Sequence, residues 1–319
     1  MYSITKEMLL DAVRHLPRTI YNLLLLEKNK RNESQASLIR DLVLSMPPSD
    51  REPFAAECQF VRDLPLDRLR KMVFPYGIRT GSEDIFDDSN IKTGRDKGLP
   101  FVVHHSGRRV YFPRVLDEAT MLESYKDLVY VEGITGHGIL EKSPHCYQDA
   151  EFSLEDGDCI LDIGCAEALF TVENMDRISK GIVFECESAW SRPLAATFQD
   201  CREKIRIVEK TVSDKTSKKT TRIMDAIAGF AAHSDKFFVK MDIEGGERSV
   251  IMGNADFFRT NKVKLSCCVY HRQDDAVVIK EILEKLGYTT RFSDGYMLIG
   301  LNGIHFPYFR RGVIYAWNH

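Results

Sequence analysis

From residue 158 to the end of the chain, short apolar runs alternate with stretches that have helical spacing. The strand candidates are 159–163, 181–185, 205–208, 236–242, 264–270, 287–292, 296–300 and 312–317. The helix candidates between them are 166–178, 188–201, 245–256 and 274–286. Strands that alternate with helices are typical of a parallel sheet covered by helices on both faces. The pattern therefore predicts an α/β fold with a doubly wound, mostly parallel sheet.

The first predicted strand leads into a glycine turn. Cys159–Ile163 is followed by Gly164, and Ala166–Phe170 are good helix formers. A glycine lets the backbone turn sharply and approach a ligand closely. A helix that begins there would present unpaired N–H groups, which suit a carboxylate or a phosphate. Because only one glycine of the G-x-G-x-x-G fingerprint is present, a purely structural turn also fits.

A carboxylate stands at the end of the second predicted strand. Glu185 lies 21 residues after Gly164, the spacing at which a carboxylate accepts ribose hydroxyls in βαβ nucleotide sites. In doubly wound sheets, ligands bind beyond the carboxyl ends of the strands. Glu185 is therefore a candidate ribose ligand, and a solvated strand end is the alternative.

Charged residues also mark the ends of the fourth and fifth predicted strands. Lys240, Asp242 and Glu244 share one face of an extended strand. Three charges on a buried strand are costly unless they are paired or functional, so a structural Lys–Asp pair is the alternative. His271 follows the fifth strand, where it is a candidate acid or base or a structural histidine.

Together these residues resemble the FkbM family of S-adenosylmethionine-dependent methyltransferases. The resemblance covers roughly residues 140–317 and rests on Asp162-Ile163-Gly164 with Phe170-Thr171, Val183-Phe184-Glu185, Val212-Ser213-Asp214, Val239–Glu247 with Val250–Gly253, and Val269-Tyr270-His271. Ser143–Tyr147 also looks like a subgroup of the family. The chain departs from the family at Ala166 and Ala168, where Asn and a second Gly are usual, and at Cys186, where Pro is frequent.

The resemblance implies a Rossmann-like class I methyltransferase with a seven-stranded sheet and S-adenosyl-L-methionine as cofactor. It implies methyl transfer to a hydroxyl oxygen of a small molecule or carbohydrate, such as a sugar, a polysaccharide or a secondary metabolite. The implied cofactor-binding residues are Asp162, Gly164, Cys165, Ala168, Glu185 and Asp242. The implied catalytic residues are Asp242, Glu244 and His271.

No metal ligand is predicted. The eight cysteines form no C-x-x-C pair, so a zinc site is not expected. His104 and His105 would point to opposite faces of a strand, which makes them poor joint ligands. Asp242, Glu244 and His271 could hold a divalent ion, and we rank this below base catalysis.

Two other functions share part of the pattern. A nicotinamide-dependent oxidoreductase would use the same turn and Glu185, but it is expected to carry the missing glycines. A non-catalytic binding protein on the same fold is favoured by Ala166 and Ala168 and opposed by the acidic and histidine residues at the strand ends.

The first part of the chain has a different pattern. Residues 1–75 read as helical and 76–98 as a long loop, followed by a hairpin at 99–103 and 109–112 and a helix at 116–127. We therefore predict an accessory region over 1–130, which shapes acceptor access, and a cofactor-binding domain over 131–319.

Charge and hydropathy limit the partners and the compartment that we expect for the protein. The formal net charge is −3, which gives no electrostatic basis for binding nucleic acid. The apolar stretches fall short of a membrane span, and the start of the chain lacks the form of a signal peptide. We expect a cytoplasmic address with reduced thiols, and a homo-oligomer is compatible with this.

Overall fold

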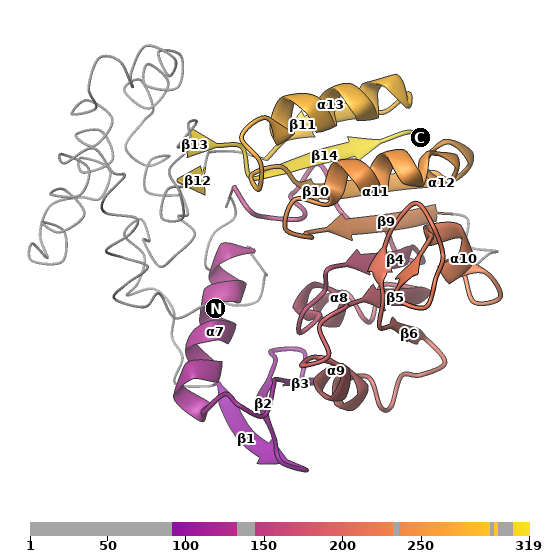
Figure 1. Cartoon of the computed structure of the whole chain (residues 1–319). Coiled ribbons are helices and arrows are strands. Elements are labelled where there is room, and N and C mark those ends of the chain that lie inside the picture. The colour runs from indigo at the N-terminus through magenta and orange to yellow at the C-terminus, as the bar shows by residue number, and fades with distance from the viewer. Residues whose placement is uncertain (1–90, 133–143, 232–235, 294–296, 299–308) are drawn as a thin grey trace, which may run out of the picture.

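A computed structural model describes residues 91–132, 144–231, 236–293, 297–298 and 309–319 (Figure 1). The helical region predicted over 1–75 and most of the loop predicted over 76–98 lie outside these residues.

The main sheet has seven strands in the order β11-β14-β10-β9-β4-β5-β6. Their bounds are β4 Cys159–Ile163, β5 Lys180–Phe184, β6 Ile205–Val208, β9 Lys236–Met241, β10 Lys262–Cys268, β11 Thr289–Phe292 and β14 Val313–Trp317. β9, β4, β5, β6 and β10 run parallel, whereas β14 is antiparallel to both of its neighbours. The predicted mostly parallel, seven-stranded sheet is confirmed.

One predicted strand does not join this sheet. Within 296–300 the structure describes only β12, Met297–Leu298, which pairs with β13, Phe309–Arg310, in a separate ladder. The seventh strand of the main sheet is instead β14. A further two-stranded ladder joins β7, Thr211–Val212, to β8, Thr220–Thr221.

Helices cover both faces of the sheet. Their bounds are α7 Glu118–Val131, α8 Leu169–Glu173, α9 Ser191–Thr197, α10 Ile223–Ile227, α11 Glu247–Gly253, α12 Ala255–Thr260 and α13 Asp275–Lys285. Side chains of α7, α8 and α9 belong to one apolar cluster, and those of α10 to α13 belong to another. None of these described helices is long and apolar enough to cross a membrane.

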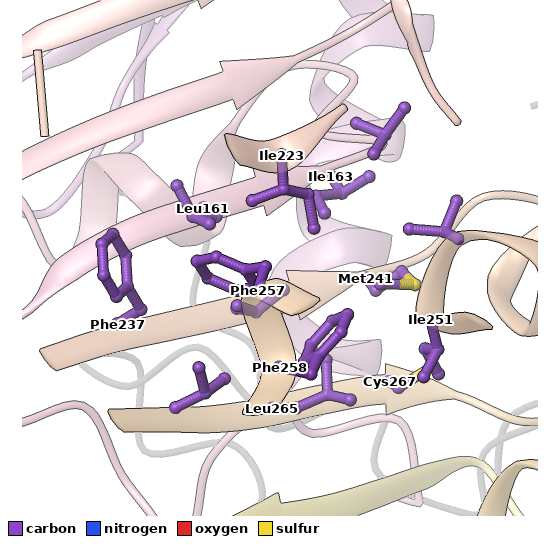
Figure 2. Close-up of a cluster of buried hydrophobic side chains, with 14 of the residues drawn as sticks. Leu161, Ile163, Ile223, Phe237, Met241, Ile251, Phe257, Phe258, Leu265 and Cys267 are labelled. Carbon is purple, nitrogen blue, oxygen red and sulfur yellow. The ribbon is translucent and has the colours of Figure 1, made fainter. Parts of the chain in front are cut away.

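The alternation of side chains along each strand separates the two clusters. In β4, Ile160 belongs to the first cluster, whereas Leu161 and Ile163 belong to the second. Figure 2 shows part of the second cluster, where side chains of β4, β9 and β10 meet Phe257 and Phe258 of α12. The strands therefore hold apolar residues on both faces, as a covered parallel sheet requires.

Several helices are shorter than predicted. The stretch 245–256 forms two helices that meet at Asn254, whose buried amide makes contacts on both sides. Asn254 Oδ1 accepts from the Ile223 N–H at 2.9 Å, and Nδ2 donates to the Ser213 carbonyl at 3.1 Å. Asn254 thereby ties the helix junction to α10 and to the segment after β7.

A small antiparallel sheet precedes the main one. The predicted hairpin is confirmed as β2, Leu99–Val103, and β3, Arg109–Tyr111. β1, Lys92–Asp96, pairs with β2, so the loop prediction is wrong over residues 92–96. The sequence of β1 is mostly polar and its residues are half-buried or exposed, and its strand form comes from backbone pairing rather than from an apolar pattern.

The small sheet and α7 share the core of the main sheet. Val102, Phe112 and Tyr125 are fully or almost fully buried and pack in one cluster with Ile160 and Phe170. The apolar core is thus continuous across the domain boundary that we predict at residue 130, and the accessory role of the first region stays a prediction.

Candidate functional site

A buried ion pair joins the ends of β4 and β9. Asp162 and Lys240 are cross-strand partners, and Lys240 Nζ lies 3.2 Å from Asp162 Oδ1. Burial opposes the charge of Lys240, but Asp162 and Asp242 outweigh it and raise the lysine pKa. Thr171 Oγ1 donates to Asp162 Oδ2 at 2.7 Å, and Lys240 Nζ donates to the Gly164 carbonyl at 2.6 Å. Asp162 is fully buried in these contacts, so it supports the turn rather than presenting its carboxylate to a ligand.

The turn after β4 has an unusual backbone. Gly164 has φ +76°, and a Cβ atom there would lie 1.9 Å from the carbonyl oxygen of Asp242. Ala166 and Ala168 also have positive φ, at 45° and 60°. This conformation favours glycine and asparagine, the residues usual at these positions in the family that the sequence resembles. Because residues 166–168 are left-handed or irregular, α8 begins at Leu169 and not at Ala166 as predicted.

The N–H groups of the turn are used within the chain. Those of Gly164 and Cys165 donate to the Phe184 carbonyl at 3.0 and 3.1 Å, and that of Ala168 donates to the Cys165 carbonyl at 2.6 Å. α8 itself has only five residues. The N–H groups of Gly164, Cys165 and Ala168 are therefore engaged within the chain, and ligand binding by the N–H groups at the start of α8 stays a prediction.

Glu185, the predicted ribose ligand, contacts the turn. Its Oε2 accepts from the Ala166 N–H at 3.0 Å, and its Oε1 accepts from the Glu187 N–H at 2.8 Å. The side chain is half-buried. Each carboxylate oxygen can accept a second hydrogen bond, so Glu185 is held in place and still able to receive two hydroxyl groups.

Asp242 lies at the centre of a polar cluster from three parts of the chain. Tyr147 donates from its hydroxyl to Oδ2 at 3.0 Å, and Tyr270 donates to Oδ1 at 3.4 Å. His145 Nε2 lies 3.4 Å from Oδ2, and His271 Nε2 lies 3.2 Å from Oδ1. Burial alone would raise the Asp242 pKa, but the two histidines hold it well below its usual value. Asp242 is therefore a fixed carboxylate.

His271 is enclosed by acidic groups. Its Nδ1 lies 2.9 Å from Glu247 Oε1, and its Nε2 faces Asp242. At these distances the ring and the carboxylates form ion pairs, although the N–H groups are not aligned for hydrogen bonds. The ion pairs determine the charge of the ring. Burial opposes protonation, but the contacts with Asp242 and Glu247 raise the His271 pKa to about 10. A ring with this pKa is suited to orienting Asp242 as a cation.

The turn after β9 separates the roles of two glutamates. Glu244 has φ 55° and a side chain that is 91% exposed, with Oε2 3.6 Å from His271 Nε2. Glu247 is fully buried, and its Oε1 accepts from the N–H groups of Ile243 and Gly245 at 3.0 and 3.4 Å. Glu247 therefore closes the turn and holds His271, whereas Glu244 faces solvent beside it.

A cavity of about 660 Å³ lies beside this turn. It is lined by Thr211, Val212, Ser213, Asp214, Ile243, Gly246, Ser249, Val250, Met252 and Gly253. Ile243 connects it to the glycine turn, because a Cβ atom on Gly164 would lie 2.8 Å from Ile243 Cγ2. The predicted site residues do not line this cavity. They lie at the edge of the sheet beside it.

Comparison with known proteins gives a family match over part of the chain. The family model described as the methyltransferase FkbM domain matches residues 175–290. These residues are similar to an FkbM methyltransferase domain. The matched residues include Glu185, Asp242, Glu244 and His271 and begin after the glycine turn. The resemblance noted in the sequence is thus confirmed.

Solved structures resemble part of this chain at low identity. The FkbM methyltransferase from Methylobacillus flagellatus KT is 20% identical with a TM-score of 0.40, over 52% of this chain and 44% of that chain. A precorrin-6y C5,15-methyltransferase from Geobacter metallireducens GS-15 is 16% identical with a TM-score of 0.34, over 51% and 82%. A putative tRNA (m1A22) methyltransferase from Streptococcus pneumoniae in complex with S-adenosyl-L-methionine is 14% identical with a TM-score of 0.35, over 51% and 67%. This chain spans less than half of the first structure, and no curated protein matches it.

Two further carboxyl groups stand near Lys240 of the FkbM domain. Burial raises the pKa of Glu167 to about 7, although its own N–H, that of Leu169 and the charge of Lys240 lower it. Removal from solvent also raises the pKa of Glu132, at the end of α7, well above its usual value. Lys240 opposes this shift, and the charge of Glu167 adds to it. Beyond their acidic character, nothing in the sequence marks these two residues as site residues.

Other members of the cluster were missed as site residues. His145, Tyr147 and Tyr270 surround Asp242 of the FkbM domain. The only signal for the first two was the resemblance of Ser143–Tyr147 to a family subgroup. They lie about a hundred residues before Asp242, so sequence spacing could not connect them with it.

The positions of His104 and His105 differ from those expected from the sequence. They follow the last residue of β2 in a turn, so the alternation of a strand does not apply to them. Both rings reach Glu173, at 2.6 Å from His104 Nε2 and 3.1 Å from His105 Nε2. The interpretation that they point to opposite faces is wrong.

The left-handed alanines of the turn predict a stabilising substitution. Ala168→Gly should raise the free energy of unfolding by about 0.5–1 kcal/mol. Glycine adopts a positive φ without the steric strain that a Cβ atom causes. The control Ala195→Gly, on the exposed side of α9, should lower it by about 1 kcal/mol. Urea unfolding measures both values, and the same sign for the two variants would contradict the backbone assignment.

The His271 cluster predicts a pH dependence of stability. The folded-state pKa of about 10 exceeds the unfolded value of about 6.5. The contribution of protonated His271 to the free energy of unfolding is therefore complete below about pH 6.5 and is lost as the pH rises to about 10. Between pH 7 and 9 the wild type should lose about 2 kcal/mol of unfolding free energy more than His271→Gln.

Urea unfolding at pH 7, 8 and 9 tests this, with His319→Gln as a control at the exposed end of the chain. The control should follow the wild type. A His271→Gln variant with the same pH profile as the wild type would show that the ring is not held as an imidazolium.

Proposed function

We propose that this protein is an S-adenosyl-L-methionine-dependent methyltransferase that methylates a hydroxyl oxygen of a sugar, a polysaccharide or a secondary metabolite. The observation that carries the proposal is the alignment of three groups along one edge of the sheet. Glu185, the Gly164 turn and Asp242 follow the adjacent strands β5, β4 and β9. This is the edge at which doubly wound sheets bind their ligands.

The residues at this edge fit the cofactor. Glu185 keeps hydrogen-bonding capacity for the two hydroxyls of a ribose. The raised pKa of Glu167 fits a carboxyl group that gains a cationic partner on binding, and the ammonium of the methionine moiety is such a group. The adjoining cavity of about 660 Å³ is within the usual size range of small-molecule sites.

Cys165 and Ala168 contribute through the backbone. Cys165 is buried and its pKa is raised, first by burial and then by the charge of Asp162. We therefore assign it no thiolate chemistry. Ala168 is fully buried and caps α8 in a left-handed conformation. Both residues shape the turn on which Glu185 is held.

Asp242 is the group that we assign to the acceptor hydroxyl. The cofactor supplies a methyl group on a sulfonium, and the leaving thioether is neutral. The residues of the chain then need to align the acceptor oxygen and receive its proton as the new bond forms. Asp242 remains ionised and is fixed by Tyr147, Tyr270, His145 and His271.

His271 and Glu244 take supporting roles in this proposal. His271 is a cation that orients Asp242 and keeps it ionised. Glu244 is exposed beside it, where it would contact an arriving acceptor. The identity of the acceptor, the cytoplasmic address and a homo-oligomeric state stay predictions from the sequence.

Calorimetric titration with S-adenosylmethionine and with its demethylated product tests the proposal. Wild-type protein should bind both, and Glu185→Gln should bind each more weakly by about 1–3 kcal/mol, because hydrogen bonds to a charged acceptor are lost. Glu187→Gln is the matched control, because Glu187 is exposed and contributes only its N–H to Glu185. It should bind as the wild type does.

The outcomes separate the claims. Absence of binding by the wild type would reject the cofactor, and a parallel titration with NADH would reveal the oxidoreductase alternative. Binding by a folded Glu185→Gln variant with unchanged affinity would reject only the ribose assignment.

A further inference from the structure

A second cluster of chemically active side chains lies apart from the Asp242 cluster. It joins His104 and His105, in the turn between β2 and β3, to Glu173, the last residue of α8. His104 Nε2 lies 2.6 Å and His105 Nε2 lies 3.1 Å from the same carboxylate oxygen, Glu173 Oε2. Two imidazoles and a carboxylate, nearly seventy residues apart, therefore direct their donor atoms to one point.

The cluster is held in place by its surroundings. His104 is buried, and its Nδ1 lies 2.7 Å from the hydroxyl of Tyr125 on α7. Tyr125 is fully buried. With Nδ1 engaged by Tyr125, Nε2 is the ring atom that faces Glu173. Histidines that bind metals commonly engage their second nitrogen in this way.

The three donors have the composition of a transition-metal site. One donor atom from each of His104, His105 and Glu173 lies within 4.8 Å of the others. The two imidazole rings are close, with centroids 4.1 Å apart, and both Nε2 atoms point to the same carboxylate oxygen. Two imidazoles and one carboxylate suit Zn²⁺, which binds three such ligands and a water molecule.

We propose that His104, His105 and Glu173 bind one Zn²⁺ ion. Tetrahedral ligands on zinc stand about 3.3 Å apart, so Glu173 needs to move away from His104 by less than about 1 Å. His105 has a side chain that is 29% exposed, so water can reach the fourth position. From the sequence, no joint metal site was expected at His104 and His105, because side chains of adjacent residues in a strand point to opposite faces.

The location gives the ion a structural role. Glu173 belongs to the helix that follows the glycine turn, whereas the histidines belong to the small sheet, and Tyr125 belongs to α7. A metal ion at this point would link the small sheet and α7 to the main fold. This site is separate from the proposed methyl-transfer site and does not depend on it.

Equilibrium dialysis of chelator-treated, full-length protein against Zn²⁺, with elemental analysis, tests the proposal. Wild-type protein should bind one more equivalent than His105→Ala or Glu173→Gln, whose affinity at this site should fall by more than about 100-fold. Tyr125→Phe keeps all three ligands and should lose about 10–100-fold. Asp176→Asn is the matched control, because Asp176 is an exposed acidic residue on the same surface that pairs with Arg108. It should bind as the wild type does.

A second measurement requires no variant. The ¹⁵N chemical shifts of both Nε2 atoms should change on addition of one equivalent of Zn²⁺, and Co²⁺ should give the visible absorption of a four-coordinate site. Equal zinc binding by wild type, His105→Ala and Glu173→Gln would overturn the proposal. Unchanged histidine shifts would also overturn it and would leave a metal-free, hydrogen-bonded cluster.

Discussion

The buried ammonium group of Lys240 is the constraint on which the rest of the site depends. It contacts Asp162 across the strands and the carbonyl of Gly164 at the turn. Buried ion pairs add little to stability over apolar packing, but removal of one partner costs about 3–5 kcal/mol. The pair therefore fixes position rather than contributing net stability. It holds the end of β4 against β9, where a side chain on Gly164 would collide with the Asp242 carbonyl.

From this contact the site extends in two directions along the edge of the sheet. Towards β5, the turn passes through Ala166, whose N–H holds Glu185. Towards β10, Asp242 meets His271, which is itself held by the buried Glu247. His271 lies between two carboxylates, and its positive charge keeps Asp242 ionised. The same carboxylates raise the pKa of the histidine, which makes it a poor base at neutral pH. In the proposed function, the histidine therefore orients the carboxylate, and the carboxylate accepts the proton.

The sequence predicts the parts of this structure that depend on local pattern. Buried apolar runs mark the strands of the main sheet, and the end of the second predicted strand correctly places Glu185 at the edge of the sheet next to the glycine turn. β1 could not be predicted, because its polar residues become a strand only by pairing with β2. Alanines favour a helix by propensity, yet tertiary contacts place Ala166 and Ala168 in left-handed conformations and delay the start of α8.

The polar partners of the site depend on long-range contacts. Tyr147 reaches Asp242 from 95 positions away, and nothing in the local sequence of either residue records that contact. The misplacement of His104 and His105 has a different cause. β2 ends at Val103, as predicted, but the alternation of a strand was applied to two residues that lie in the turn beyond it.

A crystal structure of the protein with S-adenosylhomocysteine tests the central claim most directly. The account predicts that both ribose hydroxyls lie within hydrogen-bonding distance of Glu185 and that the thioether sulfur faces Asp242. It also predicts that the contacts of Lys240 with Asp162 and Gly164 are retained. A nucleoside bound away from Glu185, or a sulfur directed away from the Asp242 cluster, would contradict it.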